Sequence, residues 1–482
     1  MSDESMHTKR VDVAVIGGGT AGLAARREAV AAGKSVVLIE GGVWGTTCAR
    51  VGCMPSKLLI AAAEVAHTIH HAGEFGIRVP AGVSIDGRAV LQRVRRHRDR
   101  FVGFVIDSVE HIPEEQRLLG QAHFVAPTTL EVGDHTRVEA RAVVIATGSR
   151  PYVPPELDAV REAVLTNENA FELENLPESV GVVGTGVVGL EVGQALHRLG
   201  VRTSLFARSD LLSPLTDPAV RDSVAKVFGG ELDVHCHVKL HVERAGDGFV
   251  LRWSDAAGGA QERRVAALLV AAGRRPWVEG LGLEHTGVTL DARGVPTFDP
   301  RTMQCGDAPI FIAGDASAYH PVLHEAADEG RIAGHNAAAY PDVRAQSRRT
   351  PLMIVFTDPN VAMVGKPFGS LDPYAIEVGC VSYEDQGRAV VMARNAGVVR
   401  IYARRDCGTL VGAEMCGPGV EHTAHLLAWA IQSHLTVEAA LAMPFYHPVF
   451  EEGIRTALRD LGARLKLQSP ERPADLECGP GT

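Results

Sequence analysis

The chain has 482 residues, of which 46% are hydrophobic and 22% charged, and its formal net charge is −10. At roughly 100–200 residues per domain this length predicts two to four domains, and the acidic balance argues against nucleic acid as a partner. No apolar run approaches the ~18 residues that span a bilayer, and residues 1–10 lack the apolar centre of a signal peptide. We therefore expect neither a nucleic-acid nor a membrane partner, and a cytoplasmic location.

The beginning of the chain has the pattern of a dinucleotide-binding unit. Residues 11–16 predict a buried strand, residues 23–33 a helix, and residues 35–40 a second strand that ends in Glu40. The motif G-x-G-x-x-G between the first strand and the helix consists of Gly17, Gly19 and Gly22. Such glycines allow a tight turn and close approach of a pyrophosphate, which the N-terminus of the helix attracts. Glu40 is placed to accept hydrogen bonds from ribose hydroxyls.

Two cysteines with four residues between them, Cys48 and Cys53, follow this unit. In an intracellular chain such a pair indicates redox or metal chemistry. A tetrahedral metal site needs two more ligands, and no second Cys or His pair lies nearby in sequence, so we expect no metal. Helix positions i and i+5 are about 7.5 Å apart along the axis, whereas a disulfide needs Cα atoms within about 6.8 Å. We therefore expect Cys48 where the chain enters a helix, Gly52 easing the distortion, and Pro55 in the first turn.

The stretch from Cys48 to Lys57, C-A-R-V-G-C-M-P-S-K, resembles the redox-disulfide motif of the class I pyridine nucleotide–disulfide oxidoreductases. This family includes dihydrolipoamide dehydrogenase, glutathione reductase and mercuric reductase. The resemblance covers about residues 10–465. It implies an α/β fold with two Rossmann-like domains, for FAD and NAD(P), a C-terminal α+β dimerisation domain, and a redox disulfide between Cys48 and Cys53. One departure is Thr46, where the family commonly has a second glycine.

The next segment predicts two long helices within residues 58–110, joined by an irregular link over residues 73–87. Short strands are expected up to residue 140, and a separate buried strand over residues 142–146. The glycine turn that follows this strand resembles the A-T-G motif that closes the family's flavin domain. By that resemblance the turn contributes two residues to the flavin site, Thr147 and Gly148.

A second dinucleotide-binding unit begins at residue 180. A strand over residues 180–183, a helix that ends near residue 200 and a strand over residues 203–206 surround another G-x-G-x-x-G motif. Its glycines are Gly184, Gly186 and Gly189. Two such units indicate two dinucleotides, a flavin in the first and a nicotinamide nucleotide in the second.

The end of that strand bears on the choice of nicotinamide. An NAD site usually places an acid there, but this chain has Ala207 and Arg208, and its next acid is Asp210. Arg208 can accept a 2′-phosphate, as an arginine at this position does in glutathione and mercuric reductases, or it is a solvent-exposed loop residue. We favour NADP(H) over NAD(H).

Three further positions resemble functional residues of the family. Glu191 resembles the glutamate that pairs with the lysine matching Lys57 beside the flavin, where Lys57 would stabilise the negative charge of the reduced cofactor. Gly273 lies in the turn that ends the nicotinamide domain. Asp315, after a strand over residues 310–312, resembles the aspartate that binds the ribityl hydroxyls of FAD.

Near the C-terminus, His447 and Glu452 resemble the catalytic dyad of the family. His447 would be the base for a substrate thiol, and Glu452 would orient its ring. In the family this histidine comes from the second subunit, so the resemblance implies a homodimer.

We expect five parts in the chain. They are a FAD-binding domain with the redox disulfide (1–150), an NAD(P)-binding domain (151–276), a central segment that completes the FAD domain (277–350), a dimerisation domain (351–467) and a flexible tail (468–482).

The resemblance favours dihydrolipoyl dehydrogenase activity on a small dithiol, such as a lipoyl group that is free or bound to a protein. An NADPH-dependent reductase of the mercuric or glutathione reductase type is the alternative enzyme. Mercuric reductases carry a vicinal cysteine pair near the C-terminus and lack the dyad, whereas here Cys478 stands alone. A non-enzymatic flavoprotein redox sensor is the alternative of another class.

Overall fold

The computed structural model describes residues 6–80, 83–211, 214–255 and 258–467. The predicted flexible tail, residues 468–482 with Cys478, lies outside the described residues. The chain forms two compact units, each built from three separate segments. Among the described residues, unit 1 contains those within 6–55, 93–152 and 273–348, and unit 2 contains those within 56–92, 153–272 and 349–467.

Unit 1 is built on a seven-stranded sheet, in which the order is β3-β2-β1-β6-β5-β4 and β16 pairs with β6. Its strands are β1 (His7–Ile16), β2 (Val36–Glu40), β3 (Arg117–Leu119), β4 (Ala122–Ala126), β5 (Thr129–Val132), β6 (Thr136–Ile145) and β16 (Ile310–Ile312). Strands β3, β2, β1, β6 and β16 pair parallel with one another, whereas β5 pairs antiparallel with both β4 and β6. The five parallel strands form the Rossmann-like arrangement expected for a dinucleotide-binding domain.

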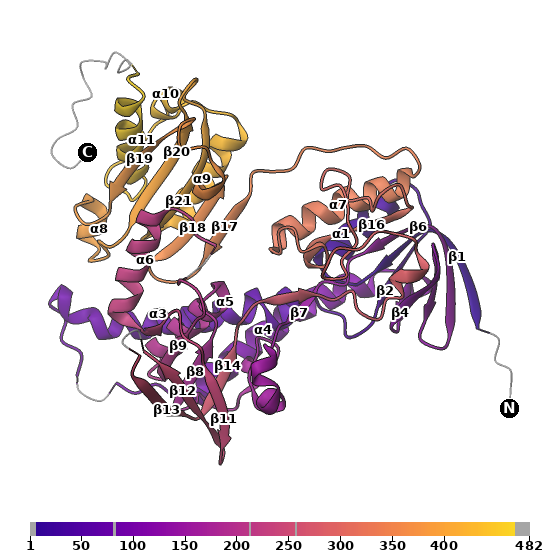
Figure 1. Ribbon diagram of the computed structural model, residues 1–482, viewed down its shortest axis with the longest axis horizontal. Helices are drawn as coiled ribbons and strands as arrows, with labels where there is room; N and C mark the ends of the chain where they lie inside the picture. The colour runs from indigo at the N-terminus through magenta and orange to yellow at the C-terminus, as the bar shows by residue number, and fades with distance from the viewer. Residues whose placement is uncertain (1–5, 81–82, 212–213, 256–257, 468–482) are drawn as a thin grey trace. The chain divides into compact units, whose positions relative to one another are not determined.

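The end of β1 is buried on both faces, as the apolar run over residues 11–16 predicts for a covered parallel strand. Residues 13–16 are at most 4% exposed. Helices α1 (Thr20–Ala31) and α7 (Leu323–Ala339) cover one face (Figure 1). They approach closely because Gly330 faces the backbone of Ala21, where an added Cβ would lie 2.2 Å from the carbonyl oxygen.

Strand β6 differs from the prediction, which divided this stretch into two separate strands at residue 140. It is one strand, Thr136–Ile145, whose first half pairs antiparallel with β5 and whose second half pairs parallel with β16. Burial alternates in the first half and is continuous over residues 142–145. The change in pattern marks a change of partner along one strand.

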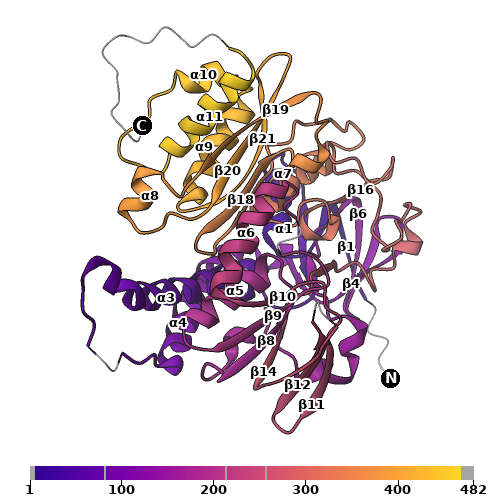
Figure 2. The same ribbon diagram turned by 60° about the vertical axis from the view of Figure 1, so that its left-hand side comes forward.

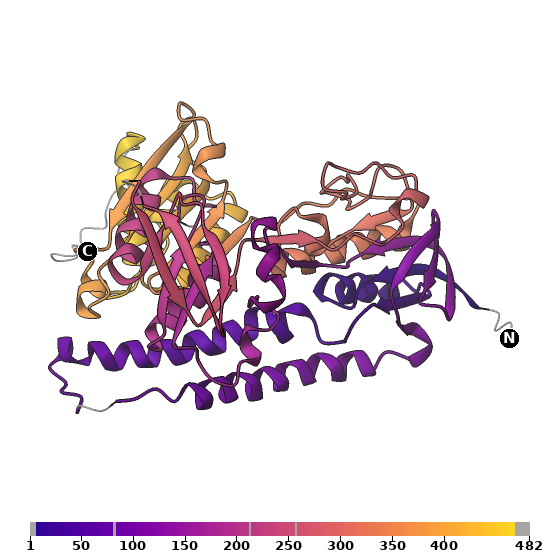
Figure 3. The same cartoon turned by 60° about the horizontal axis from the view of Figure 1, so that its bottom comes forward.

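The two long helices predicted after the cysteines are present as α3 (Cys53–His71) and α4 (Gly87–Glu110) (Figure 3). Charged residues recur along the 24 residues of α4, such as the basic run over residues 93–98. Within the described ranges, no helix is both long enough and apolar enough to cross a membrane.

Unit 2 contains a second parallel sheet in the order β10-β9-β8-β14, which is the predicted second dinucleotide-binding fold. Its elements are β8 (Ser179–Val183), α5 (Val187–Arg198), β9 (Arg202–Phe206), α6 (Pro218–Glu231), β10 (Asp233–His235) and β14 (Ala267–Val270). A three-stranded antiparallel sheet precedes β14 in the chain, with β11 (His241–Ala245), β12 (Gly248–Ser254) and β13 (Ala260–Val265).

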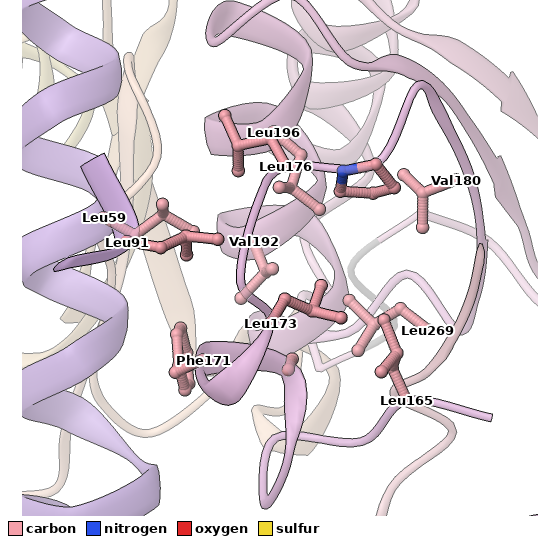
Figure 4. A pocket seen from close by; sticks show the side chains of 12 residues that line it. Leu59, Leu91, Leu165, Phe171, Leu173, Leu176, Val180, Val192, Leu196 and Leu269 are labelled. Atoms are coloured by element: carbon pink, nitrogen blue, oxygen red, sulfur yellow. The ribbon is translucent and has the colours of Figure 1, made fainter. Parts of the chain in front are cut away.

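A small cavity in unit 2 shows how α3 and α4 attach to this sheet (Figure 4). Leu59 of α3 and Leu91 of α4 face Val192 and Leu196 of α5 across it. All twelve lining residues are apolar, so the cavity is a hydrophobic packing contact without polar groups that could orient a ligand.

The C-terminal part of unit 2 is an α+β domain (Figure 2). Its antiparallel sheet has the order β17-β18-β21-β20-β19. Its strands are β17 (Leu352–Val355), β18 (Asn360–Gly365), β19 (Ile376–Ser382), β20 (Val398–Arg404) and β21 (Leu410–Gly417), and its helices are α8 (Gly387–Val391), α9 (Val420–Gln432), α10 (Val437–Leu441) and α11 (Glu452–Arg464). Helices α9 and α11 pack on the sheet around one apolar core, and α11 begins at Glu452 of the predicted dyad.

Candidate active site

The three glycines of the first motif have different structural roles. Gly17 has a φ of +109°, and an added Cβ would lie 2.2 Å from the carbonyl oxygen of Ala146. A Cβ on Gly22 would lie 1.8 Å from the oxygen of Gly17, so this residue lets α1 pack on the turn. Gly19, the N-cap of α1, faces open space. The motif therefore offers unobstructed backbone at a helix N-terminus, as a phosphate site requires.

Glu40 and Thr147 lie at the ends of β2 and β6, on either side of this turn. Glu40 accepts hydrogen bonds from the backbone N–H groups of Gly18 and Gly42, both at 2.8 Å. A carboxylate has about four acceptor positions, so Glu40 retains capacity for a ribose hydroxyl. The Thr147 hydroxyl is buried and meets no hydrogen-bond partner within the described part of the chain. An orphaned buried hydroxyl beside a nucleotide motif fits a bound FAD, which would supply its partner.

Asp315, the expected ribityl acceptor, is held by a short relay in unit 1. Its carboxylate accepts a hydrogen bond of 2.6 Å from the hydroxyl of Ser149, which in turn accepts one of 2.7 Å from Nε of Arg274. Ser149 and Arg274 begin the paired strands β7 (Ser149–Pro151) and β15 (Arg274–Pro276). The preceding Gly148 has a φ of +72° and faces open space. These contacts fix Asp315 at the edge of the flavin domain.

The second motif repeats the geometry of the first in unit 2. Gly184 has a φ of +104°, and its Cβ would lie 2.4 Å from the oxygen of Ala271. A Cβ on Gly189 would lie 2.0 Å from the oxygen of Gly184, whereas Gly186, the N-cap of α5, faces open space. The motif fits a second dinucleotide. Gly273, which belongs to unit 1, has a φ of +108° and also faces open space.

Cys48 and Cys53 lie in two consecutive helices. Cys48 is half-buried in the short α2 (Thr47–Val51), and Cys53 is exposed as the first residue of α3. Gly52 separates the helices, and its Cβ would lie 3.2 Å from Cα of Cys48. Cys48 therefore belongs to its own helical turn instead of the entrance to the helix of Cys53. Pro55 lies in the first turn of α3, as predicted, and Cys53 occupies a helix N-terminus that favours a thiolate.

Thr46, where the family commonly has a glycine, has a backbone conformation that favours glycine. Its φ is +52°, a conformation that is costly for a β-branched residue. Its hydroxyl accepts a hydrogen bond of 3.2 Å from the backbone N–H of Ala49, which caps α2. The side chain thus compensates for backbone strain with a helix cap.

The predicted pair of Lys57 and Glu191 is formed, and Phe356 contacts both residues. The Lys57 ammonium lies 2.7 Å from Oε2 of Glu191, whose residue is 3% exposed. Oε1 of Glu191 accepts a hydrogen bond of 2.9 Å from the backbone N–H of Phe356. The ammonium also lies 4.7 Å from the centre of the Phe356 ring. Both oxygens of Glu191 are therefore engaged, and the cation is held between a carboxylate and an aromatic face.

His447 and Glu452 are also paired. Nδ1 of His447 lies 3.0 Å from Oε1 of Glu452, and the backbone N–H of Val449 donates to Oε2 at 3.2 Å. The His447 side chain is 61% exposed, whereas that of Glu452 is 6% exposed. A buried carboxylate thus holds one ring nitrogen and leaves Nε2 directed away from it, the arrangement that a general base requires.

Arg208 lies at the end of β9 and is largely exposed. Its side chain is 68% exposed, and Nη1 lies 3.4 Å from Oε1 of Glu156. The nearby Asp210 accepts a hydrogen bond of 2.7 Å from His237 and forms an ion pair with Arg221. Each of its two carboxylate oxygens therefore contacts another side chain.

The structure thus joins four of the predicted residues into two pairs within unit 2, whereas the cysteines and the flavin motif belong to unit 1. Among the described residues, no group of three or more His, Cys, Asp and Glu side chains could hold a metal ion. Sequence reasoning missed Phe356, Ser149 and Arg274. Phe356 acts partly through its backbone and is 165 positions from Glu191. The contact therefore could not be predicted from the residue type or from the spacing.

The comparisons with known proteins agree with this geometry. Residues 11–330 match the model of the pyridine nucleotide-disulphide oxidoreductase family, and residues 352–458 match that of its dimerisation domain. The chain is 30% identical over 466 residues to a dihydrolipoyl dehydrogenase of Bacillus subtilis, covering 92% of this chain and 97% of the relative. It is 33% identical over 440 residues to a mercuric reductase of Streptomyces lividans, covering 89% and 91%.

Solved structures show the same fold. LpdA from Mycobacterium tuberculosis superposes with a TM-score of 0.80 at 26% identity, covering 93% of this chain and 99% of that one. The HOCl-induced flavoprotein disulfide reductase RclA from Escherichia coli has a TM-score of 0.76 at 21% identity, covering 95% and 99%.

Proposed function

Because the chain belongs to the pyridine nucleotide-disulphide oxidoreductase family, whose members use FAD and NAD(P), we propose that it is a dihydrolipoyl dehydrogenase or a near relative. The observation that carries this proposal is the pair of His447 and Glu452. A base held by a buried carboxylate suits a substrate that must lose thiol protons.

The proton step begins at Nε2 of His447. This nitrogen accepts the proton of a substrate thiol, and Glu452 stabilises the imidazolium through Nδ1. The resulting thiolate attacks the sulfur of Cys48, the Cys48–Cys53 bond breaks, and Cys53 departs with the electron pair as a thiolate. After His447 passes its proton to solvent, it accepts the proton of the second substrate thiol. The second thiolate attacks the substrate sulfur of the mixed disulfide and releases Cys48 as a thiolate. The substrate leaves as a disulfide, and its two electrons remain on the cysteine pair.

FAD, when bound, would take these two electrons and deliver them to the nicotinamide as a hydride. The residues of this chain that support that chemistry are Lys57 and Glu191. By the family resemblance, the Lys57 ammonium would supply positive charge where the cofactor becomes negative, and Glu191 would fix its position. The hydrogen bonds around Glu191 support this role because they hold the lysine against an almost fully buried carboxylate.

The dimerisation domain supports a homodimer. The exposed ring of His447 suits a site that is completed by a second copy of the chain, as the resemblance implies. We propose that the histidine of one subunit serves the cysteine pair of the other. The cytoplasm is the compartment that we expect for this thiol chemistry.

For the nicotinamide we propose a preference for NADP(H). Arg208 supports it because its guanidinium is accessible, and Ala207 supports it because it stands where an NAD site usually has an acid. In the presence of a 2′-phosphate, Arg208 would exchange the long contact with Glu156 for a charge-assisted one.

A mercuric reductase is the second candidate, since the relative from Streptomyces lividans is 33% identical to this chain. Steady-state kinetics separate the candidates. Dihydrolipoamide, glutathione disulfide and Hg²⁺ would each be assayed with both nicotinamides. We expect the highest kcat/KM with dihydrolipoamide and NADP⁺; a higher value with Hg²⁺ and NADPH would overturn the proposal in favour of the second candidate.

A further inference from the structure

Unit 1 contains a cluster of buried charges that the proposed reaction does not use. Three carboxylates on α7 are almost fully buried, with exposures of 3% for Glu325, 4% for Asp328 and 0% for Glu329. The guanidinium of Arg348 lies among them and is 15% exposed. Burying a carboxylate costs free energy of folding unless it is paired and hydrogen-bonded. We therefore asked which neighbouring groups these carboxylates hold in position.

Glu329 connects this cluster to the flavin site. Its Oε2 accepts hydrogen bonds from the backbone N–H of Gly314, at 2.8 Å, and from the hydroxyl of Ser317, at 3.2 Å. These residues bound the 3₁₀ turn Gly314–Ser317, which contains Asp315. Glu329 therefore holds both ends of the turn that presents the expected ribityl acceptor.

Arg348 holds Glu329 from the opposite side. Its Nη2 donates to Oε1 of Glu329 at 3.1 Å and also to Oε2 of Glu325, and its Nε lies 3.9 Å from Oδ2 of Asp328. Burial raises the pKa of Glu329 to about 7, and the cation of Arg348 opposes that rise. Without this cation the pKa of Glu329 would rise further, and the ionised carboxylate would face two other buried carboxylates.

We propose that Arg348 is a positioning residue for the flavin: it keeps Glu329 in place as the acceptor that fixes the Gly314–Ser317 turn, and so determines how tightly FAD is held. This inference rests on the flavin site of the proposed function and adds a residue that acts through Glu329. The chain of contacts runs from Arg348 to Glu329, and from Glu329 to the backbone beside Asp315.

The test measures FAD binding to apoprotein at pH 8, by the quenching of flavin fluorescence during reconstitution. Arg348→Met should weaken FAD binding about tenfold, the size expected for losing a charge-assisted hydrogen bond. Arg348→Lys, which keeps the charge, should give an intermediate value. Arg344→Met removes an exposed guanidinium from the same segment and should leave FAD binding unchanged.

The double variant decides whether Arg348 acts through Glu329. In a Glu329→Gln background, Arg348→Met should weaken FAD binding less than about threefold, since the shared contact is already lost. An equal effect in both backgrounds, or FAD binding by Arg348→Met within twofold of the wild type, overturns the proposal. If Arg348→Met does not fold, Arg348→Lys is compared in the two backgrounds in the same way. Because only FAD binding is measured, failure of the proposed dithiol activity would not affect this result.

Discussion

The imidazole of His447 is held by a single buried carboxylate, with Nδ1 lying 3.0 Å from Oε1 of Glu452. The ring itself is exposed and the carboxylate is buried. The relationship defines one tautomer, in which Nδ1 carries a proton toward Glu452 and Nε2 can accept one from a substrate.

Replacement of His447 should therefore affect turnover without affecting the flavin. We expect His447→Gln to slow dithiol oxidation ~10²–10⁴-fold, as for loss of a general base, and to retain FAD. Stopped-flow measurement of flavin reduction by dihydrolipoamide checks this, with His422→Gln as a control at an exposed histidine of the same domain. A fully active His447→Gln enzyme would remove the assigned role.

With Lys57 beside the flavin, as proposed, its contact with Phe356 predicts an effect on the flavin potential, because the ring helps to hold the ammonium that stabilises the reduced flavin. Phe356→Leu keeps the backbone N–H that binds Glu191 but removes the ring that lies 4.7 Å from the ammonium. A cation–π contact of about 0.5–1 kcal/mol corresponds to about 10–20 mV for a two-electron couple. We expect the midpoint potential to fall by up to this amount and Phe356→Tyr to restore it.

The matched control for Phe356→Leu is Phe104→Leu on α4. Phe104 is 57% exposed and its ring lies 5.6 Å from the guanidinium of Arg100. This variant removes a similar contact at the surface and should not change the potential. Equal shifts in both leucine variants would show that Phe356 has no specific influence on Lys57.

The exposed guanidinium of Arg208 predicts the choice of nicotinamide. Arg208→Ala should raise the KM for NADPH about tenfold, because one charge-assisted contact to the 2′-phosphate is lost, and should leave the KM for NADH nearly unchanged. Arg202→Ala, at the other end of β9 and 71% exposed, serves as the control. An equal increase in the KM for both nucleotides would contradict the proposal that Arg208 determines a preference for NADP(H).

Glu329 predicts a dependence of stability on pH. Burial raises its pKa from 4.5 to about 7, so the native state holds a proton that the unfolded state has lost between these values. The contribution of this group to the free energy of unfolding is fully present below about pH 4.5 and is lost as the pH rises through about 7. The loss is at most about 3 kcal/mol. Between pH 5 and 8, the melting temperature of the wild type should fall more steeply than that of Glu329→Gln. Parallel profiles would show that Glu329 does not titrate in this range.

Local patterns allowed much of this molecule to be predicted. Gly17 and Gly184 both require a positive φ and a backbone neighbour too close for any Cβ, and such constraints are visible in the sequence as fixed glycine spacings. His447 and Glu452 are five positions apart, and Glu452 begins α11. Their short spacing in the sequence therefore also indicated the pair. The extent of β6 could not be predicted because a single strand changes from antiparallel to parallel partners.

Contacts between distant segments were not visible in the sequence. Phe356 reaches Glu191 through its backbone, and Arg348 reaches the flavin turn through Glu329, so neither side chain has a motif of its own. The strain at Thr46 was visible only as a missing glycine, and the cap that compensates for it depends on the helix that begins at Thr47.

The proposed electron path through Cys48 and Cys53 is tested most directly by anaerobic reduction of the bound flavin with dihydrolipoamide. Wild-type protein should show rapid flavin reduction and subsequent reduction of NADP⁺. Cys53→Ser should bind FAD normally, show no flavin reduction by the dithiol, and still accept a hydride from NADPH. Dithiol-dependent flavin reduction in Cys53→Ser at the wild-type rate would contradict the proposal that this cysteine pair carries the electrons.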